Sequence, residues 1–394
     1  MRVAFLTAGG IAPCLSASIG MLINEYYKYD KSIKFIGYLH GYKGLLINKK
    51  IFLSYSNEIK SLCDFGGSII GNSRVKLTNI DDCVNNNYIK EGELPLEIAA
   101  QRLMSDKIDI LHTIGGDDTN TTAGELVKYL EEHNYQLTVV GLPKTIDNDI
   151  IPIKQTLGAV TAAEQTSKFF QNIVNENTTS SRQLIIHEVM GRNCGWLTAY
   201  SAYLYRESLN MKTFIPDILL DRNRWDIHAI YIPEDEFDLE QEVERLRQVI
   251  DDVDCANIFL SEGAGVNNII KEMKKNNKEV KYDAFGHVRL DEINPGKWYA
   301  DYFKDKLECD KILVKKSGYF ARSSAPNVED LKLIHRTSHH AVKCGIEKKS
   351  CVVGLSDESN QIDCIDFSEI KGGKIFDIKT DWYLAMISDI GQKN

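Results

Sequence analysis

The sequence lacks the features that mark several specialised classes of protein. Its 394 residues include no apolar stretch of the roughly 20 residues that a membrane-spanning helix needs. Lys and Arg total 47 against 56 Asp and Glu, so the formal charge is −9 and no general positive field attracts nucleic acid or anionic lipid. The nine cysteines are scattered without a Cys-x-x-Cys pair, which argues against a disulfide framework or a zinc knuckle. We therefore expect no nucleic-acid or membrane partner.

The same absences predict where the chain works. Unclustered cysteines are typical of a reduced, intracellular compartment. The apolar segment at residues 3–8 is followed at once by two glycines, so it is too short for the apolar region of a signal peptide. The sequence therefore predicts a cytoplasmic protein.

What is present is the composition of a folded protein, with 43% hydrophobic and 26% charged residues. The length suffices for two domains or subdomains. Apolar strand-like segments are expected at residues 3–8, 33–38, 108–114, 137–141, 183–189, 257–261 and 350–355. Helical segments are expected at residues 15–27, 95–104, 121–132, 156–175, 195–206, 239–252, 295–306 and 328–344. Because the strand segments are apolar on both faces, this alternation predicts an α/β fold of doubly wound parallel sheets covered by helices.

Glycine-rich loops follow two of the predicted strands. In open α/β sheets, ligands gather at the carboxyl ends of strands. Gly9 and Gly10 open the first loop, where backbone amides and the next helix favour an anion, although a plain tight turn explains them equally well. In the second loop, Asp117 is a candidate ligand for Mg²⁺ that bridges phosphate oxygens. The alternative there is that Asp118 or Thr119 caps the following helix.

A third loop, at residues 143–149, carries a cation and several polar groups directly after a buried strand. Lys144 is a candidate point charge for phosphate, and Asp147 is a candidate base for deprotonating a hydroxyl. The alternative is an Asx-rich turn, which explains Asn148 and Asp149 but explains Lys144 poorly.

The three loops taken together, in this order, resemble the phosphofructokinase family. The match continues through Met190-Gly191-Arg192, Ser261-Glu262-Gly263 and Tyr319-Phe320-Ala321-Arg322, and it spans nearly the whole chain. Its details are closer to the pyrophosphate-dependent branch than to the ATP-dependent one. The resemblance implies reversible, Mg²⁺-dependent transfer of a phosphoryl group from pyrophosphate to the 1-hydroxyl of fructose 6-phosphate. The products would be fructose 1,6-bisphosphate and phosphate.

The resemblance also implies roles for individual residues. Asp147 corresponds to the catalytic base and Asp117 to the Mg²⁺ ligand. Gly10, Arg74 and Lys144 correspond to the diphosphate-binding positions, with Arg74 reaching the transferred phosphoryl group. The positions that correspond to contacts with the sugar phosphate are Thr145, Ile146, Asp147, Met190, Gly191, Arg192, Glu262, Tyr319, Phe320, Ala321 and Arg322.

Two positions favour pyrophosphate as the donor. The patterns typical of ATP-using relatives are Gly-Gly-Asp-Gly and Pro-Gly-Thr-Ile-Asp. This sequence has Asp118 in place of the last glycine of the first pattern and Lys144 in place of the glycine of the second. Like charges about 4 Å apart repel by about 4 kcal/mol at an effective dielectric of about 20, so Asp118 opposes the α-phosphate of a nucleotide. Lys144 supplies a cation for the short leaving group.

Three alternatives stay open from the sequence. An ATP-dependent phosphofructokinase is disfavoured by Asp118 and Lys144. A non-catalytic sugar-phosphate-binding regulatory subunit is disfavoured by the intact set of Asp117, Lys144, Asp147 and Arg192. A nicotinamide-dependent oxidoreductase would fit the fold class, but the glycine fingerprint of that class is missing.

The resemblance further implies two subdomains that face one another across a cleft. We expect residues 1–150 with about 323–371 to bind pyrophosphate and Mg²⁺, and about 151–322 with 372–394 to bind fructose 6-phosphate. A homodimer or homotetramer is expected. Arg182, Lys315 and Lys316 are candidates for a cation lent across a subunit interface, although solvated surface explains each better. The sequence departs from the family pattern at Cys14, Ser16 and Tyr319, the last in place of a common histidine.

Overall fold

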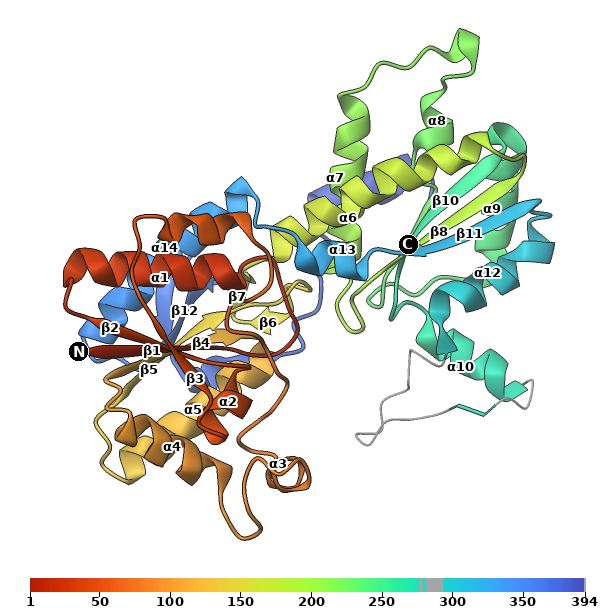
Figure 1. The fold of residues 1–394 in the computed structure, drawn as a ribbon. Coiled ribbons are helices and arrows are strands. Elements are labelled where there is room, and N and C mark those ends of the chain that lie inside the picture. Colours follow the sequence, from red (N-terminus) through yellow and green to blue (C-terminus); the bar gives the residue numbers. More distant parts are fainter. Residues whose placement is uncertain (276–278, 281–292, 393–394) are drawn as a thin grey trace. The chain divides into compact units, whose positions relative to one another are not determined.

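The computed structural model describes residues 1–275, 279–280 and 293–392 (Figure 1). The chain divides into two compact units. Unit 1 comprises Met1–Ala162 and Ala321–Lys374, and unit 2 comprises Ala163–Phe320 and Ile375–Asn394. The chain enters unit 2 within helix α6 (Ala159–Ile173) and returns to unit 1 within helix α13 (Gly318–Ser323). Among the described residues, no helix combines the length and the apolar character that crossing a membrane requires.

Unit 1 is built on a mixed sheet with the strand order β13-β12-β5-β4-β1-β2-β3, and β7 also pairs with β12. The bounds of these strands are β1 Arg2–Thr7, β2 Lys34–Tyr38, β3 Lys50–Leu53, β4 Ile110–Gly115, β5 Thr138–Pro143, β7 Ile153–Gln155, β12 Cys351–Ser356 and β13 Ile362–Ile365. The central pairs are parallel, but β3, β7 and β13 run antiparallel to their neighbours. The sheet is therefore mainly parallel, as expected, with three antiparallel strands added to it. The link from β12 to β13 is too short for the crossover that a parallel pair needs.

Helices cover both faces of this sheet. On one face, Ala4 and Leu6 of β1 share a core with Leu103 of α4 (Pro95–Ser105) and Leu126 of α5 (Asp117–Glu132). On the other face, Phe5 stacks on His112, which contacts Tyr26 of α1 (Leu15–Tyr29). Helix α14 (Val328–Ile346) packs beside α1 and against β5. This arrangement confirms the doubly wound α/β architecture.

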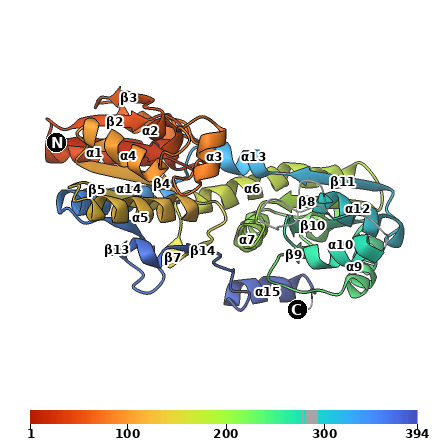
Figure 2. The same cartoon turned by 90° about the horizontal axis from the view of Figure 1, so that it is seen from below.

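Unit 2 contains a parallel sheet with the strand order β11-β8-β10-β9. Its strands are β8 Gln183–Val189, β9 Ala229–Tyr231, β10 Cys255–Ser261 and β11 Lys311–Lys316. The helices α9 (Leu239–Val253) and α12 (Pro295–Lys306) bury Leu246 and Phe303 against one face. The other face carries an aromatic cluster that includes Phe170 of α6, His187 of β8, and Tyr205 of α7 (Trp196–Asn210). Helix α15 (Asp381–Asp389) contacts α7 (Figure 2).

All the strand and helix segments expected from the sequence are present, with boundaries shifted by a few residues. The strands not anticipated are short or lie at sheet edges, and they include β3, β7, β9, β11 and β13 together with the paired β6 (Ile150–Ile151) and β14 (Lys371–Gly372). The other helices in the described part of the chain are α2 Tyr42–Leu46, α3 Ile80–Asn85, α8 Arg222–Trp225 and α10 Val266–Lys275, with 3-10 turns at Ile59–Asp64, Val174–Thr178, Pro216–Ile218 and Phe367–Glu369.

Candidate active site

The three loops singled out from the sequence follow β1, β4 and β5, which are neighbours in the sheet of unit 1. Because these strands are parallel, their carboxyl ends meet at one edge of the sheet. The Gly9 amide donates to the carbonyl of Ser73 at 2.9 Å, so the loop that precedes Arg74 joins the same edge. Asn120 donates to the carbonyls of Gly115 and Gly116 and so supports the second glycine loop. The fold thus brings the predicted donor-site residues together.

Lys144 is a buried cation at the centre of this group. Its Nζ donates to the carbonyl of Gly10 at 2.7 Å, and only 4% of the residue is exposed. Burial, with a smaller effect of the Arg322 charge, lowers the pKa of Lys144 to about 8, and this value already includes the opposing effects of Cys14, Asp147 and Asp149. A lysine with this pKa is still mostly protonated at pH 7. The site therefore holds a positive charge directly against the first glycine loop.

The loop from Lys144 to Asp149 is held by hydrogen bonds within unit 1. The Asp147 amide donates to Oγ1 of Thr145 at 3.2 Å, and the hydroxyl of Thr156 donates to the carbonyl of Thr145 at 2.8 Å. Asn148 lies in the left-handed region at φ 56°, and its side-chain oxygen accepts from the amide of Thr156. Asn148 thus adopts the left-handed conformation that suits Asn in a turn, but its side chain binds Thr156 rather than forming an Asx turn.

Asp117 and Asp118 belong to the first turn of α5, which begins four residues earlier than expected. Gly116 is the N-cap and no side chain caps this helix, so the interpretation of Asp118 or Thr119 as a cap is wrong. The carboxylate of Asp117 lies against Gly372 of β14, where any larger residue would overlap it. Burial raises the pKa of Asp149, and the charge of Asp117 raises it further. The structure therefore places two carboxylates in the same part of unit 1.

Asp118 faces solvent and forms an ion pair with Lys76. The two charged atoms are 2.7 Å apart, and 62% of the Asp118 side chain and 41% of the Lys76 side chain are exposed. The sequence analysis did not anticipate this partner. No spacing rule connects Lys76 to Asp118, because Lys76 lies in a loop and Asp118 in the first turn of α5, 42 residues further along the chain.

Two of the three arginines expected at the site, Arg74 and Arg322, belong to unit 1. Arg74 is exposed, in the loop whose Ser73 carbonyl binds Gly9. Arg322 extends to the first glycine loop, where Nη1 donates to the carbonyl of Ile11 at 3.2 Å and lies close to Gly10. Ala321, which precedes it, is buried. Arg322 therefore lies beside the residues expected to bind pyrophosphate.

Cys14 and Ser16, which depart from the family pattern, serve internal contacts. The Cys14 thiol is buried and donates to the carbonyl of Leu157, and burial raises its pKa. Both the amide and the hydroxyl of Ser16 donate to the carbonyl of Gly67. The first turn of α1 is thus tied to residue 67 of the chain.

A second group of expected site residues lies in unit 2, after the adjacent strands β8, β10 and β11. The Ser261 hydroxyl donates to the carbonyl of Gly191, and the amide of Glu262 donates to the carbonyl of Val189 at 2.9 Å. The Gly191 amide lies 3.5 Å from Oε1 of Glu262. These bonds join the first two loops.

The third loop of unit 2 adds the aromatic residues. Met190 lies against Gly318, so the loop after β8 also touches the one after β11. Tyr319 is 89% exposed, whereas the ring of Phe320 lies 5.7 Å from that of Phe169. The structure thus brings Met190, Gly191, Arg192, Glu262, Tyr319 and Phe320 to one edge of the unit 2 sheet.

Arg192 opens onto a pocket of about 1030 Å³ in unit 2. The acidic residues Asp235, Glu236 and Asp238 line the pocket, as does Gly263. Burial raises the pKa of Asp235, and the charge of Glu242 adds to this effect. The sequence analysis missed these acids because they follow β9, a three-residue strand that it did not identify.

Comparison with known proteins identifies the family of the chain. The family model described as phosphofructokinase matches residues 2–344. A pyrophosphate–fructose 6-phosphate 1-phosphotransferase from Methylomonas methanica is 53% identical, over 99% of this chain and 96% of the relative. A protein of the same name from Mastigamoeba balamuthi is 49% identical, with the same two coverages of 99% and 96%.

A crystal structure shares the fold. It is that of a pyrophosphate-dependent phosphofructokinase from Marinobacter aquaeolei, with a TM-score of 0.72 at 21% identity, covering 100% of this chain and 92% of that one. The family match runs through the strand-end loops of both units, from Gly10 to Arg322. With most of its length matched and relatives of about half identity, the chain belongs to the phosphofructokinase family.

Proposed function

We propose that this chain is a pyrophosphate-dependent phosphofructokinase. It transfers a phosphoryl group from pyrophosphate to the 1-hydroxyl of fructose 6-phosphate, and the reaction is reversible. Relatives that carry this activity in their names match nearly the whole chain. The observation that carries the proposal is the buried ammonium of Lys144, which donates to the Gly10 carbonyl. The family pattern of ATP-using relatives has glycine at the position of Lys144.

Unit 1 supplies the residues that bind the donor. Pyrophosphate carries several negative charges in a short molecule, and phosphoryl transfer depends on positioning and charge stabilisation more than on covalent help. Lys144 and Arg322 both border the Gly10 loop, and Arg74 follows the residues that bind Gly9. Lys144 and Arg74 bind the diphosphate, and Arg74 reaches the phosphoryl group that moves.

The carboxylates of Asp117 and Asp149 fit a magnesium ion. Mg²⁺ in phosphate sites is held by one or two carboxylates together with phosphate oxygens and waters. The pKa of Asp149 is raised by burial and by the charge of Asp117, which means that the two anions repel each other unless a cation is present. When bound there, Mg²⁺ would neutralise negative charge on the diphosphate. Asp117 is its principal ligand in this proposal.

Asp147 is the base for the acceptor. The oxygen of the sugar 1-hydroxyl forms the new bond to phosphorus, the bond to the bridging oxygen of the donor breaks, and phosphate leaves. The hydroxyl proton passes to the carboxylate of Asp147. The Thr145 hydroxyl accepts from the Asp147 amide and so fixes the backbone from which this carboxylate projects.

The remaining residues bind and orient fructose 6-phosphate. Thr145, Ile146, Ala321 and Arg322 contribute from unit 1, while the residues of unit 2 form the second group described above. Arg192 supplies positive charge for the phosphate of the sugar. Glu262 repels phosphate, so it accepts hydrogen bonds from sugar hydroxyls. Tyr319 donates a phenol hydrogen bond where many relatives have histidine.

Selection of pyrophosphate over ATP is shared between Lys144 and Asp118. The Lys76 ammonium holds the Asp118 carboxylate in place and offsets part of its charge. Asp118 therefore excludes the nucleoside end of ATP by occupying space as well as by repulsion. The homodimer or homotetramer and the cytoplasmic location belong to the same proposal.

A coupled assay with purified chain tests this function. Fructose 6-phosphate is supplied with either pyrophosphate or ATP, each with and without Mg²⁺. We expect turnover with pyrophosphate that depends on Mg²⁺ and little turnover with ATP. The double variant Asp118→Gly, Lys144→Gly should weaken the use of pyrophosphate and allow some use of ATP. Activity confined to ATP would overturn the proposal, and an unchanged donor preference in the double variant would remove these two residues from donor selection.

A further inference from the structure

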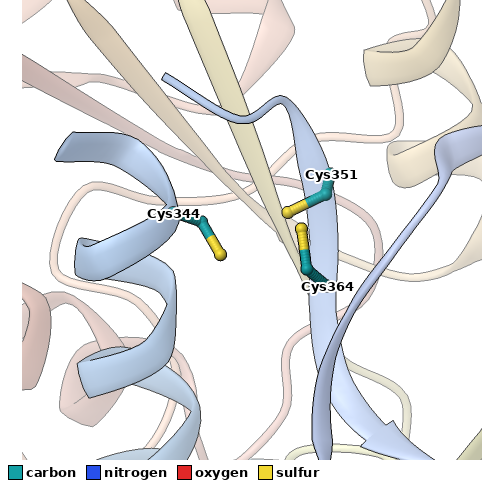
Figure 3. Close-up of side chains that lie close together, drawn as sticks. All are labelled: Cys344, Cys351 and Cys364. Carbon is teal, nitrogen blue, oxygen red and sulfur yellow. The ribbon is translucent and has the colours of Figure 1, made fainter. Parts of the chain in front are cut away.

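Three cysteines that have no part in the proposed reaction converge in unit 1. Cys344 lies near the end of α14, Cys351 begins β12, and Cys364 lies in β13 (Figure 3). Their Sγ atoms all lie within 4.8 Å of one another. Cys344 and Cys351 are buried, and Cys364 is exposed. The cluster is therefore closed on one side and open to solvent on the other.

The backbone fixes this convergence. Cys364 is paired with Val353 across the antiparallel β12–β13 ladder, and residues directly opposite one another share a face of the sheet. Cys351 lies two residues before Val353 on β12, so it points to the same face. Helix α14 packs on β12 and β13 and directs Cys344 toward the two strand cysteines (Figure 3). Three separate elements thus aim thiols at one point.

The spacing is compatible with a shared metal ion. Zinc–sulfur bonds are about 2.3 Å long, so sulfurs around a tetrahedral ion lie about 3.8 Å apart. Sulfurs within 4.8 Å of one another reach that spacing by closing about 1 Å or less. A disulfide requires contact at about 2.05 Å and leaves the third thiol unused. Thiolates select soft cations such as Zn²⁺ and Cu⁺. Binding of a soft cation displaces the thiol protons, because only thiolates are ligands.

We propose that Cys344, Cys351 and Cys364 bind one thiophilic metal cation of the Zn²⁺ or Cu⁺ class. The exposed Cys364 gives the ion its entry from solvent, and water would supply a further ligand. No residue proposed for phosphoryl transfer belongs to this cluster. The site ties α14 to β12 and β13, so its role is structural, and bound metal raises the stability of the chain by mass action.

The test uses the full chain, freed of metal and kept reduced by a reductant that contains no thiol. Co²⁺ alone should give a near-ultraviolet thiolate-to-cobalt charge-transfer band, and native mass spectrometry should find one Zn²⁺ per chain. Cu⁺ delivered from a competing chelator forms the second arm and distinguishes the two metals. Zn²⁺ should also raise the melting temperature of the wild-type chain.

The variant Cys364→Ser removes an exposed ligand and leaves the buried thiols in place, so the chain should fold. We expect it to weaken Zn²⁺ binding by at least about tenfold, since changes even outside the ligand shell cost that much. It should also abolish the rise in melting temperature. Cys63→Ser is the matched control, because Cys63 is a partly exposed thiol of unit 1 outside the cluster. It should behave like the wild type.

Three results would overturn the proposal. The first is that the reduced chain retains neither metal at stoichiometric amounts. The second is that Cys364→Ser binds Zn²⁺ as tightly as Cys63→Ser does. The third is that two of the three cysteines form a disulfide under the same reducing conditions and no metal is bound.

Discussion

At the scale of single residues, Lys144 is the side chain in which burial and function meet. Burying a charged lysine costs free energy unless polar groups accept its hydrogen bonds. Here the Gly10 carbonyl accepts one, and the charges of Asp147 and Asp149 favour the protonated form. The free-energy cost of burying this charge is offset further when an anion binds beside it. Lys144 is therefore suited to binding an anionic substrate.

The pKa of Lys144 leads to a prediction about pH. Its folded-state pKa of about 8 lies below the ordinary value of 10.5, so the side chain is charged below pH 8 and becomes neutral above it. We expect the KM for pyrophosphate to rise as pH increases through 8. Well above pH 8 the rise should approach about tenfold per pH unit, because the charged fraction of Lys144 falls by that factor. Steady-state kinetics between pH 7 and pH 9.5 measure it.

The conservative control is Lys144→Met, which keeps the length of the side chain and removes the charge. Its KM for pyrophosphate should be high and nearly constant over the same range of pH. A wild-type KM that stays constant up to pH 9.5 would show that Lys144 is not the titrating cation.

The contribution of Lys144 to the free energy of unfolding should increase as pH rises from 8 toward 10.5. The reason is that the cost of burying the charged side chain disappears over this range.

Asp147 carries the second prediction. Asp147→Ser removes the carboxylate that accepts the hydroxyl proton, so kcat should fall by about 10²–10⁴-fold, the usual contribution of a general base. The KM for fructose 6-phosphate should change only a few-fold, since other residues hold the sugar phosphate. Steady-state kinetics give both values, and a urea denaturation curve checks that the variant is folded. A kcat close to that of the wild type would exclude Asp147 as the base.

At the scale of elements, the sequence predicts central strands well and edge strands poorly. Strands such as β4 and β8 are buried along their whole length, so their continuous apolar pattern is visible in the sequence. In β3, Ile51 and Phe52 are 46% and 69% exposed, and in β13 Cys364 is exposed. An edge strand has a neighbour on one side only and is less buried, so fewer of its residues need to be apolar. The apolar pattern by which a strand is recognised is then weak.

The same distinction applies to the candidate site. Gly10, Asp117 and Lys144 were found because each closely follows a strand with a strong apolar pattern. Contacts between distant segments were not found, and the ion pair of Asp118 with Lys76 is one of them. Another is the close approach of Gly372 to Asp117. Such contacts depend on how loops pack after the sheet has formed, and no local pattern encodes them.

The N-terminus of α14 leads to a prediction about stability. The Asp330 side chain is fully buried and accepts hydrogen bonds from the amides of Gly158 and Thr161. It also accepts one from the Thr161 hydroxyl. Asp330→Ala would leave these donors buried without an acceptor, at a cost of about 1–3 kcal/mol for each unsatisfied group. We expect a loss of about 3 kcal/mol or more in the free energy of unfolding of unit 1.

Urea denaturation of the full chain, with a probe in unit 1, measures this loss. The matched control is Glu329→Ala, which removes the neighbouring carboxylate from the same first turn of α14. Glu329 is exposed, so its loss should change stability by less than about 0.5 kcal/mol. Equal effects of the two substitutions would mean that the buried hydrogen bonds of Asp330 contribute little.

At the scale of the whole molecule, unit 2 is completed by the end of the chain. Residues 375–394 return to unit 2 after the second passage through unit 1. The Gln392 side chain is buried, its Oε1 accepts from the amide of Ile230 at 2.8 Å, and its Nε2 donates to the carbonyl of Ile230 at 2.9 Å. The Gln392 side chain thereby provides hydrogen-bond partners for the backbone of Ile230 at the free edge of β9, as a further strand would. A segment distant in sequence thus protects an edge of the parallel sheet.

Gln392→Ala should therefore loosen unit 2 and leave unit 1 unaffected. Loss of both bonds leaves the buried amide and carbonyl of Ile230 without partners, at a cost of about 1–3 kcal/mol for each group. Hydrogen exchange measured by mass spectrometry on the full chain should become faster in β9 and stay the same in β4 of unit 1. Lys379→Ala, an exposed position in the same terminal segment, is the control and should change neither. Faster exchange throughout both units would show that the two unfold together, and no change in β9 would show that its edge is protected by other groups.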